Sequence, residues 1–120
     1  MKKFIILMIL SVILLSGCAK SLNYWGNYSY TLYKYKKVQT DDAYEKHKRC
    51  VEKIIRKSEG KDKKVPPGIY CEYGYYLLME GDADRCLEYF DKEVIAYPES
   101  ETFINTLKAQ FELDKEQSDE

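Results

Sequence analysis

Side chains able to do acid–base or metal chemistry are few and scattered in this 120-residue chain. There is one histidine, His47, and no Cys-x-x-Cys pair accompanies it to form a zinc site. The carboxylates Glu72, Glu80 and Glu93 lie on segments with helical periodicity, where charged side chains ordinarily face solvent. The sequence contains no glycine-rich phosphate loop, no Gly-x-Ser-x-Gly and no His-Glu-x-x-His element. We therefore expect a non-enzymatic protein with neither a metal nor another cofactor.

Thiol chemistry is the remaining possibility, because the chain has four cysteines. Cys50, Cys71 and Cys86 fall on the apolar stripes of expected helices, without a Cys-x-x-Cys or zinc-like spacing. We favour small buried core residues for these three. One disulfide with one spare thiol is the alternative in an oxidising compartment.

The fourth cysteine, Cys18, follows a distinctive N-terminus. Two lysines precede an apolar run from Phe4 to Leu15, which is too short to span a membrane and is typical of a secretory signal. The run ends in Leu-Ser-Gly-Cys, which resembles a bacterial lipobox, where the cysteine sulfur takes a diacylglyceryl group. We expect residues 1–17 to be a signal peptide, cleaved between Gly17 and Cys18, and Cys18 to be acylated. An ordinary signal with an accidental cysteine is the alternative.

A lipid on Cys18 would determine where the protein is held. Buried acyl chains anchor a protein to a membrane through the hydrophobic effect. In lipoproteins of this kind, Ala19 rather than Asp at the next position implies sorting to the outer membrane. We expect a lipid-anchored protein on the periplasmic face of the outer membrane.

Length and charge limit the remaining classes. About 100 residues stay after cleavage, enough for one small domain. Loss of Lys2 and Lys3 leaves 17 basic against 20 acidic residues. A nucleic-acid binder needs the opposite balance, so no nucleic-acid partner is expected.

The spacing of apolar residues and the positions of helix-capping and helix-ending residues predict an all-α fold. Apolar residues recur at spacings of three and four between capping, glycine and proline residues. The expected helices run from 27 or 28 to about 38, from 41 to about 58, from Pro66-Pro67 to Gly81, from Asp82 to Pro98, and onward from Ser100. The helical domain would span residues 27–114, after a tether of residues 18–26 and before a frayed acidic tail of residues 115–120.

The segment from Pro67 to Pro98 resembles a tetratricopeptide repeat, a helical hairpin of about 34 residues. The template asks for bulky, small, bulky, small, aromatic and proline residues at fixed positions, and these are met by Tyr70, Gly74, Leu77, Cys86, Phe90 and Pro98. Small residues let two antiparallel helices approach, the aromatic ring fills the groove between them, and proline ends the second helix.

The rest of the domain fits this template less well. The upstream helices lack the small residue at their crossing and read as a degenerate repeat. The last segment, with an apolar stripe of Phe103, Ile104, Leu107 and Phe111, resembles the helix that covers the end of such stacks. We expect two antiparallel hairpins plus a C-terminal capping helix. So short a stack predicts homo-oligomerisation or docking on a second repeat protein.

Aromatic residues crowd the region from Tyr24 to Lys37, which holds five tyrosines and the only tryptophan. A repeat cannot bury its apolar face alone, so we expect one stripe of this region to pack as core: Trp25, Tyr28, Leu32 and Tyr35. The tyrosines off that stripe are the candidate partner-binding residues: Tyr24, Tyr30 and Tyr33. Their rings suit a protein strand or a glycan.

Several stretches together resemble a family of small Gram-negative lipoproteins of unknown function. These stretches are LSGC, YWGNY followed by LYKY, PPGIYCEYGYYLLMEGD and YPESETF. Members are often encoded beside a lipoprotein similar to the curli secretion channel, which makes such a lipoprotein a candidate partner. The resemblance implies a periplasm-facing accessory subunit of an envelope assembly. A peptidoglycan- or glycan-binding lipoprotein, using Tyr24, Trp25 and Tyr30, is the alternative.

Overall fold

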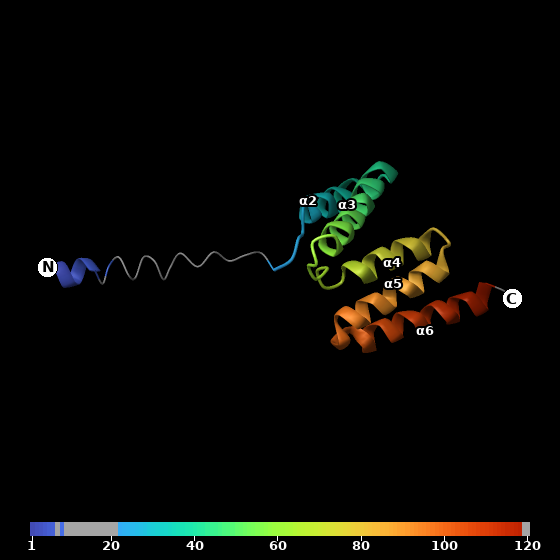
Figure 1. The fold of residues 1–120 in the computed structure, drawn as a ribbon. Helices are drawn as coiled ribbons and strands as arrows, with labels where there is room; N and C mark the ends of the chain where they lie inside the picture. The colour runs from blue at the N-terminus through green and yellow to red at the C-terminus, as the bar shows by residue number, and fades with distance from the viewer. Residues whose placement is uncertain (7, 9–21, 119–120) are drawn as a thin grey trace.

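The computed structural model describes residues 1–6, 8 and 22–118, and in these residues the regular elements are all helices, without a strand (Figure 1). The predicted all-α class is therefore confirmed. The predicted cleavage and lipidation residues, Gly17 and Cys18, lie outside the described residues. Among the described helices, none combines the length and the apolar character needed to cross a membrane.

The first two long helices form a hairpin, α2 (Tyr28–Val38) and α3 (Asp41–Glu59). Gln39 ends α2 in a left-handed conformation with φ 51°, and the Thr40 side chain accepts a hydrogen bond from the backbone N–H of Ala43 to begin α3. The buried residues of α3 follow one stripe: Ala43, His47, Val51, Ile54, Ile55 and Ser58. By contrast, α2 has no buried residue.

The second hairpin pairs α4 (Ile69–Met79) with α5 (Ala83–Ala96), and these two helices make the most extensive contact among the described elements. Gly74 sets their separation. A Cβ at this position would lie 3.0 Å from a Phe90 ring carbon and 3.1 Å from the Cys86 carbonyl oxygen. A side chain at position 74 would therefore have to displace the Phe90 ring or the α5 backbone by a few tenths of an ångström, so glycine favours the close crossing of α5 over α4.

The start of α4 differs from the prediction. Pro66 and Pro67 do not occupy the first helical turn but precede it, and Gly68, with φ 85°, is the N-cap. A left-handed residue at this position reverses the chain between the prolines and the helix, a conformation that glycine adopts without strain. The helix therefore begins at Ile69.

The last elements are a 3₁₀ turn, η1 (Pro98–Ser100), and α6 (Glu101–Ser118). Ile104 is fully buried, and the Lys108 Nζ lies 2.6 Å from the Asp91 Oδ1 of α5. Helix α6 extends to Ser118, beyond the point where the acidic tail was expected to fray.

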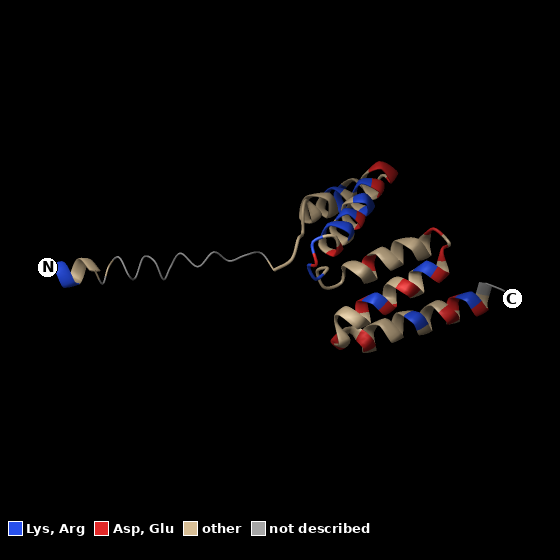
Figure 2. Cartoon of the chain, viewed as in Figure 1, with Lys and Arg blue, Asp and Glu red and all other residues tan. Residues whose placement is uncertain are grey.

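Charge divides between the two halves of the folded region (Figure 2). Residues 22–65, with α2 and α3, hold 12 basic and 6 acidic residues. Residues 66–118, with α4, α5 and α6, hold 4 basic and 12 acidic residues. The near-neutral composition therefore conceals a basic end and an acidic end.

Candidate functional site

A polar cluster lies where α2, α3 and α4 meet. The His47 side chain is fully buried, with its Nδ1 2.8 Å from the Thr31 hydroxyl and its Nε2 2.7 Å from Glu72 Oε1. The Glu72 carboxylate also accepts hydrogen bonds from the hydroxyls of Tyr28, at 2.7 Å, and Tyr76, at 2.5 Å. Since each helix contributes at least one member, the cluster ties α2 to the rest of the fold.

The environment of Glu72 favours its ionised form. Burial alone would raise the pKa of this carboxyl, but hydrogen bonds from His47, Tyr76 and Tyr28 outweigh burial and hold the pKa below its ordinary value. The same carboxylate, together with burial, raises the pKa of the Tyr28 and Tyr76 hydroxyls, which stay protonated as donors. The cluster is thus a carboxylate surrounded by donors.

Thr31, His47 and Glu72 have the order of groups found in nucleophile–base–acid triads. Two observations point to a structural role instead. The imidazole of His47 is shielded by the rings of Tyr28 and Tyr76, with centroids at 5.1 and 6.1 Å, and has no exposed surface. The Thr31 hydroxyl also lies 3.1 Å from the Tyr28 carbonyl oxygen of its own helix. We interpret the cluster as the joint between the hairpins.

The expectation that Glu72 and Glu93 are solvated was wrong. Glu72 belongs to the cluster above, and Glu93 is buried at the start of α4. Its two oxygens accept hydrogen bonds from the backbone N–H groups of Gly68, at 2.7 Å, and Cys71, at 3.3 Å. Because Gly68 has no side chain with which to cap α4, a carboxylate from α5 does so.

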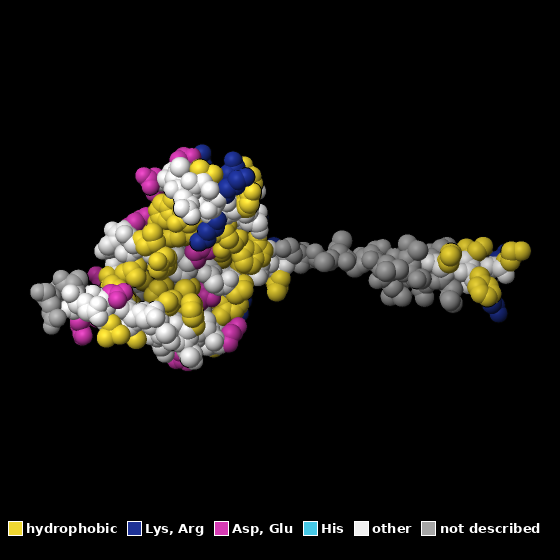
Figure 3. Space-filling view, turned by 180° about the vertical axis from the view of Figure 1, so that it is seen from behind, with side chains coloured by type: hydrophobic (Ala, Val, Ile, Leu, Met, Phe, Trp, Pro, Cys, Tyr) yellow, Lys and Arg dark blue, Asp and Glu magenta, His cyan; other side chains and the backbone are white. Residues whose placement is uncertain are grey.

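A largely apolar concave surface lies between α4 and α6, and we name it the α4–α6 groove. It has a volume of about 600 Å³. Its lining comes from α4, α5, η1, α6 and the loop before α4: Pro67, Gly68, Cys71, Glu72, Tyr75, Glu93, Tyr97, Glu99, Ser100, Phe103, Ile104 and Leu107. Figure 3 shows hydrophobic side chains gathered over one face of the folded region, with acidic side chains among them.

The groove is open to solvent along its aromatic walls. Phe103 is 60% exposed, and Tyr75 and Glu99 are also exposed. Burial, followed by the charge of Glu93, raises the pKa of the Cys71 thiol to about 11, so this thiol is protonated and weakly nucleophilic at neutral pH. The groove can therefore bind an apolar surface but offers no activated nucleophile.

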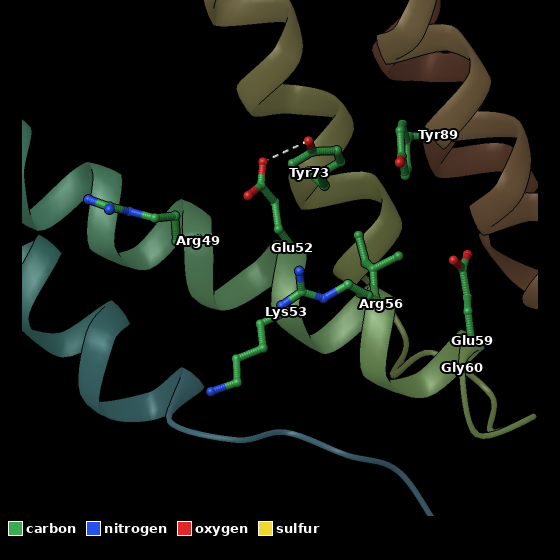
Figure 4. A pocket seen from close by; sticks show the side chains of 9 residues that line it. Arg49, Glu52, Lys53, Arg56, Glu59, Gly60, Tyr73 and Tyr89 are labelled. Atoms are coloured by element: carbon green, nitrogen blue, oxygen red, sulfur yellow. Dashed lines mark hydrogen bonds between the residues drawn. The ribbon is translucent and has the colours of Figure 1, made fainter.

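A second cleft, of about 690 Å³, lies between α3, α4 and α5 (Figure 4). In Figure 4 the Glu52 and Tyr73 side chains point toward one another, and their hydrogen bond is 2.9 Å long. Arg49, Lys53 and Arg56 line the same cleft from α3. Since cations and carboxylates share the walls, the cleft favours no single class of ligand.

The predicted aromatic core of α2 needs correction. Trp25 is 41% exposed and touches Tyr28 edge to face, with ring centroids 5.4 Å apart. Tyr28, Leu32 and Tyr35 are half-buried rather than buried. The reason is that, among the described elements, α2 makes its main contact with α3 alone, so its opposite side stays open.

The predicted partner-binding tyrosines fall into two groups. Tyr30 and Tyr33 are 63% and 59% exposed on α2. Tyr24 is instead half-buried against the core, with the Lys57 Nζ 5.7 Å from its ring centroid. Only Tyr30 and Tyr33 are therefore well placed to meet a partner.

The predicted packing residues of the α4–α5 hairpin differ in burial. Tyr70, Gly74, Leu77, Cys86 and Phe90 are buried, whereas Pro98 is exposed and begins η1. The likeness of this hairpin to a tetratricopeptide repeat stays a prediction.

The cysteines differ from the expectation that all three are buried. Only Cys86 is buried, Cys50 and Cys71 are half-buried, and all three are free thiols.

Sequence reasoning missed the groove. It placed Phe103 with Ile104 on the buried stripe of the last helix, yet only Ile104 is buried. Tyr75, adjacent to the buried Tyr76, was not singled out. Two consecutive apolar residues on a helix point about 100° apart, so both can be buried, as Ile54 and Ile55 are, or only one, and the sequence alone does not say which.

Comparison with known proteins gives one family. The sequence profile of DUF4810, described as a domain of unknown function, matches residues 22–107. No curated protein and no solved structure gives a significant match.

Proposed function

We propose, from the premise that this chain belongs to the DUF4810 family, that it is a non-enzymatic interaction subunit of an envelope assembly, held on the outer membrane by a lipid. The matched region includes both hairpins and all the residues that line the α4–α6 groove, so the groove belongs to the family domain.

One observation carries the interaction role: Tyr75 and Phe103, which line the α4–α6 groove together with Leu107, are exposed. Soluble proteins rarely leave a contiguous apolar concavity open unless something binds there. A groove between helices, with aromatic walls and an acidic edge at Glu99, suits a helix or an extended segment of another protein.

The anchoring part of the proposal rests on the sequence. The basic start, the apolar run and the Leu-Ser-Gly-Cys element support a lipid on Cys18, and Ala19 supports the outer membrane. A lipoprotein similar to the curli secretion channel is the candidate partner implied by the resemblance described above.

A site-specific photo-crosslinker at position 103 tests the interaction role in intact cells. The full-length chain carrying it should give adducts with one or a few defined envelope proteins or with itself. The matched control carries the crosslinker at Ile95, which is exposed on α5 and outside the groove. If position 103 gives no more adduct than position 95, the interaction role fails.

The anchor has a separate test. Cys18→Ser should abolish metabolic labelling with a fatty acid and release the protein from the outer-membrane fraction. Labelling that persists in Cys18→Ser would overturn the predicted lipidation site.

Glycan binding is the second candidate, and the exposure of both Trp25 and Tyr30 favours it. Exposed aromatic rings can stack on sugar faces. The full-length chain in detergent should then pellet with purified cell-wall sacculi, and Trp25→Ala should reduce that pelleting. Protein that stays in the supernatant would exclude this candidate.

A further inference from the structure

We propose that the α4–α6 groove receives helix α2 of a second copy of this chain, so that copies associate head to tail. This inference rests on the interaction role proposed above and names the partner of the groove.

The outer face of α2 has the pattern of a helix that docks into a groove. Tyr30, Tyr33, Lys34 and Lys37 follow one another at the spacing i, i+3, i+4 and i+7, which is the spacing of anchor residues in such complexes. All four are exposed. The Lys34 Nζ lies 5.8 Å from the Tyr30 ring centroid, and the Lys37 Nζ lies 5.5 Å from that of Tyr33. The face therefore combines two aromatic anchors with two cations.

The α2 helix cannot reach the groove of its own chain. Its opposite face is held by the Tyr28 hydrogen bond to Glu72 and by the Thr31 contact with His47. Only an α2 from another molecule can therefore present Tyr30 and Tyr33 to the groove.

Charge selects the head-to-tail arrangement. The donor end, residues 22–65, has twice as many basic as acidic residues, and the acceptor end, residues 66–118, has three times as many acidic as basic residues. Lys34 and Lys37 would approach the acidic edge at Glu99. Contact between two α2 faces, or between two grooves, would bring like charges together and is disfavoured.

The proposed contact is heterologous, since different surfaces of the two copies meet. Each copy keeps a free groove or a free α2, so association continues until a ring closes or a row forms. Attachment of every copy to one membrane would raise the local concentration and favour such contacts, even weak ones.

A thiol crosslink between two full-length copies tests the geometry. One copy carries Tyr33→Cys and a first affinity tag, and the other carries Phe103→Cys and a second tag. After co-expression, membranes are treated with a short bismaleimide. We expect a crosslinked pair holding both tags, well above the background that the natural cysteines, including Cys71 in the groove, give when Tyr33→Cys is paired with an otherwise unsubstituted copy. The matched control replaces Phe103→Cys by Ile95→Cys, which should return the yield to background.

A charge exchange tests the same contact without relying on a crosslink geometry. Lys37→Glu on the donor copy should weaken pairing in detergent by about two- to fivefold, the range for an exposed charge pair. Glu99→Lys on the acceptor copy should restore it. Failure of Glu99→Lys to rescue Lys37→Glu would overturn the assignment of the acidic edge as the α2 site.

The outcomes separate this inference from the interaction role. If Phe103→Cys captures another envelope protein and never a second copy, head-to-tail pairing is wrong and the interaction role stands. If position 103 captures neither, both are wrong. Circular dichroism of each variant establishes that it is folded, which these exposed substitutions should leave unchanged.

Discussion

The helices of the second hairpin pack through apolar contacts, whereas the first hairpin depends largely on polar contacts. Between α4 and α5 the contact is apolar and close, with the Phe90 ring against Gly74. Between α2 and its neighbours the contact is polar, centred on His47 and Glu72, and α2 buries no residue completely. Close apolar packing resists disruption at all pH values, whereas a carboxylate network depends on ionisation. We infer that the α4–α5 hairpin provides most of the stability. The contact of α2 with the rest of the fold is weaker, because it depends on the ionisation of Glu72.

The largest loss of stability should come from a substitution in the core of the α4–α5 hairpin. Phe90→Ala removes a fully buried ring and leaves a cavity, which should cost about 3 to 5 kcal/mol in the free energy of unfolding. Urea unfolding of the full-length chain, followed by circular dichroism, measures it. A loss below about 1 kcal/mol would mean that the α4–α5 contact does not dominate stability.

Substitution in the polar cluster of His47 and Glu72 should cause a smaller loss of stability, confined mainly to α2. Glu72→Gln keeps the shape but removes the charge that Tyr28, Tyr76 and His47 surround, and we expect a cost of about 1 to 3 kcal/mol. Hydrogen exchange should accelerate in α2 and change little in α5. Glu88→Gln, on the exposed side of α5, is the control. Uniform acceleration over both hairpins would contradict a separable joint.

Low pH should weaken the polar contact centred on Glu72 without weakening the apolar contact between α4 and α5. The folded pKa of Glu72 lies below the ordinary value of 4.5, so its stabilising contribution is complete above that pH and is lost as pH falls through the folded pKa. The stability gap between the unsubstituted chain and Glu72→Gln should therefore narrow as pH falls below about 4.5. Unfolding titrations at a series of pH values measure this gap. A gap that stays constant to the lowest pH would show that Glu72 does not ionise differently on folding.

The smallest effect on stability is expected in the groove. Phe103→Ala removes the same kind of ring as Phe90→Ala, but from an exposed position, and should change the free energy of unfolding by less than about 0.5 kcal/mol. Crosslinking from Tyr33→Cys on one copy to Leu107→Cys in the groove of another copy should nevertheless fall. A large loss of stability would assign Phe103 to the core and remove the basis for a binding groove.

Local sequence signals predicted the helices well. Thr40 and Asp82 both cap the helices that the pattern placed after them. Gly74 illustrates a residue type that favours close packing, since a Cβ there would crowd the Phe90 ring. Such features could be read because capping, periodicity and close approach depend on residues near one another in sequence or on a repeated pattern.

The positions of Glu72, Glu93 and Phe103 could not be predicted in the same way. From sequence alone, a carboxylate on a helix is expected to be solvated. It can instead be buried when a helix distant in sequence supplies hydrogen-bond donors, as the N-terminus of α4 does for Glu93. An aromatic residue looks buried until the neighbouring helices leave its face uncovered, as at Phe103. These outcomes depend on which surfaces remain after packing.

The sequence by itself determined the all-α class, the hairpin boundaries to within a few residues, and the sign of charge on each segment, because all three follow from local composition and periodicity. Only the tertiary structure decided that His47 and Glu72 meet, that Glu93 caps another helix, and that a groove stays open beside α6. The physical reason is that burial and hydrogen-bond partners are properties of several helices together, and no single segment encodes them.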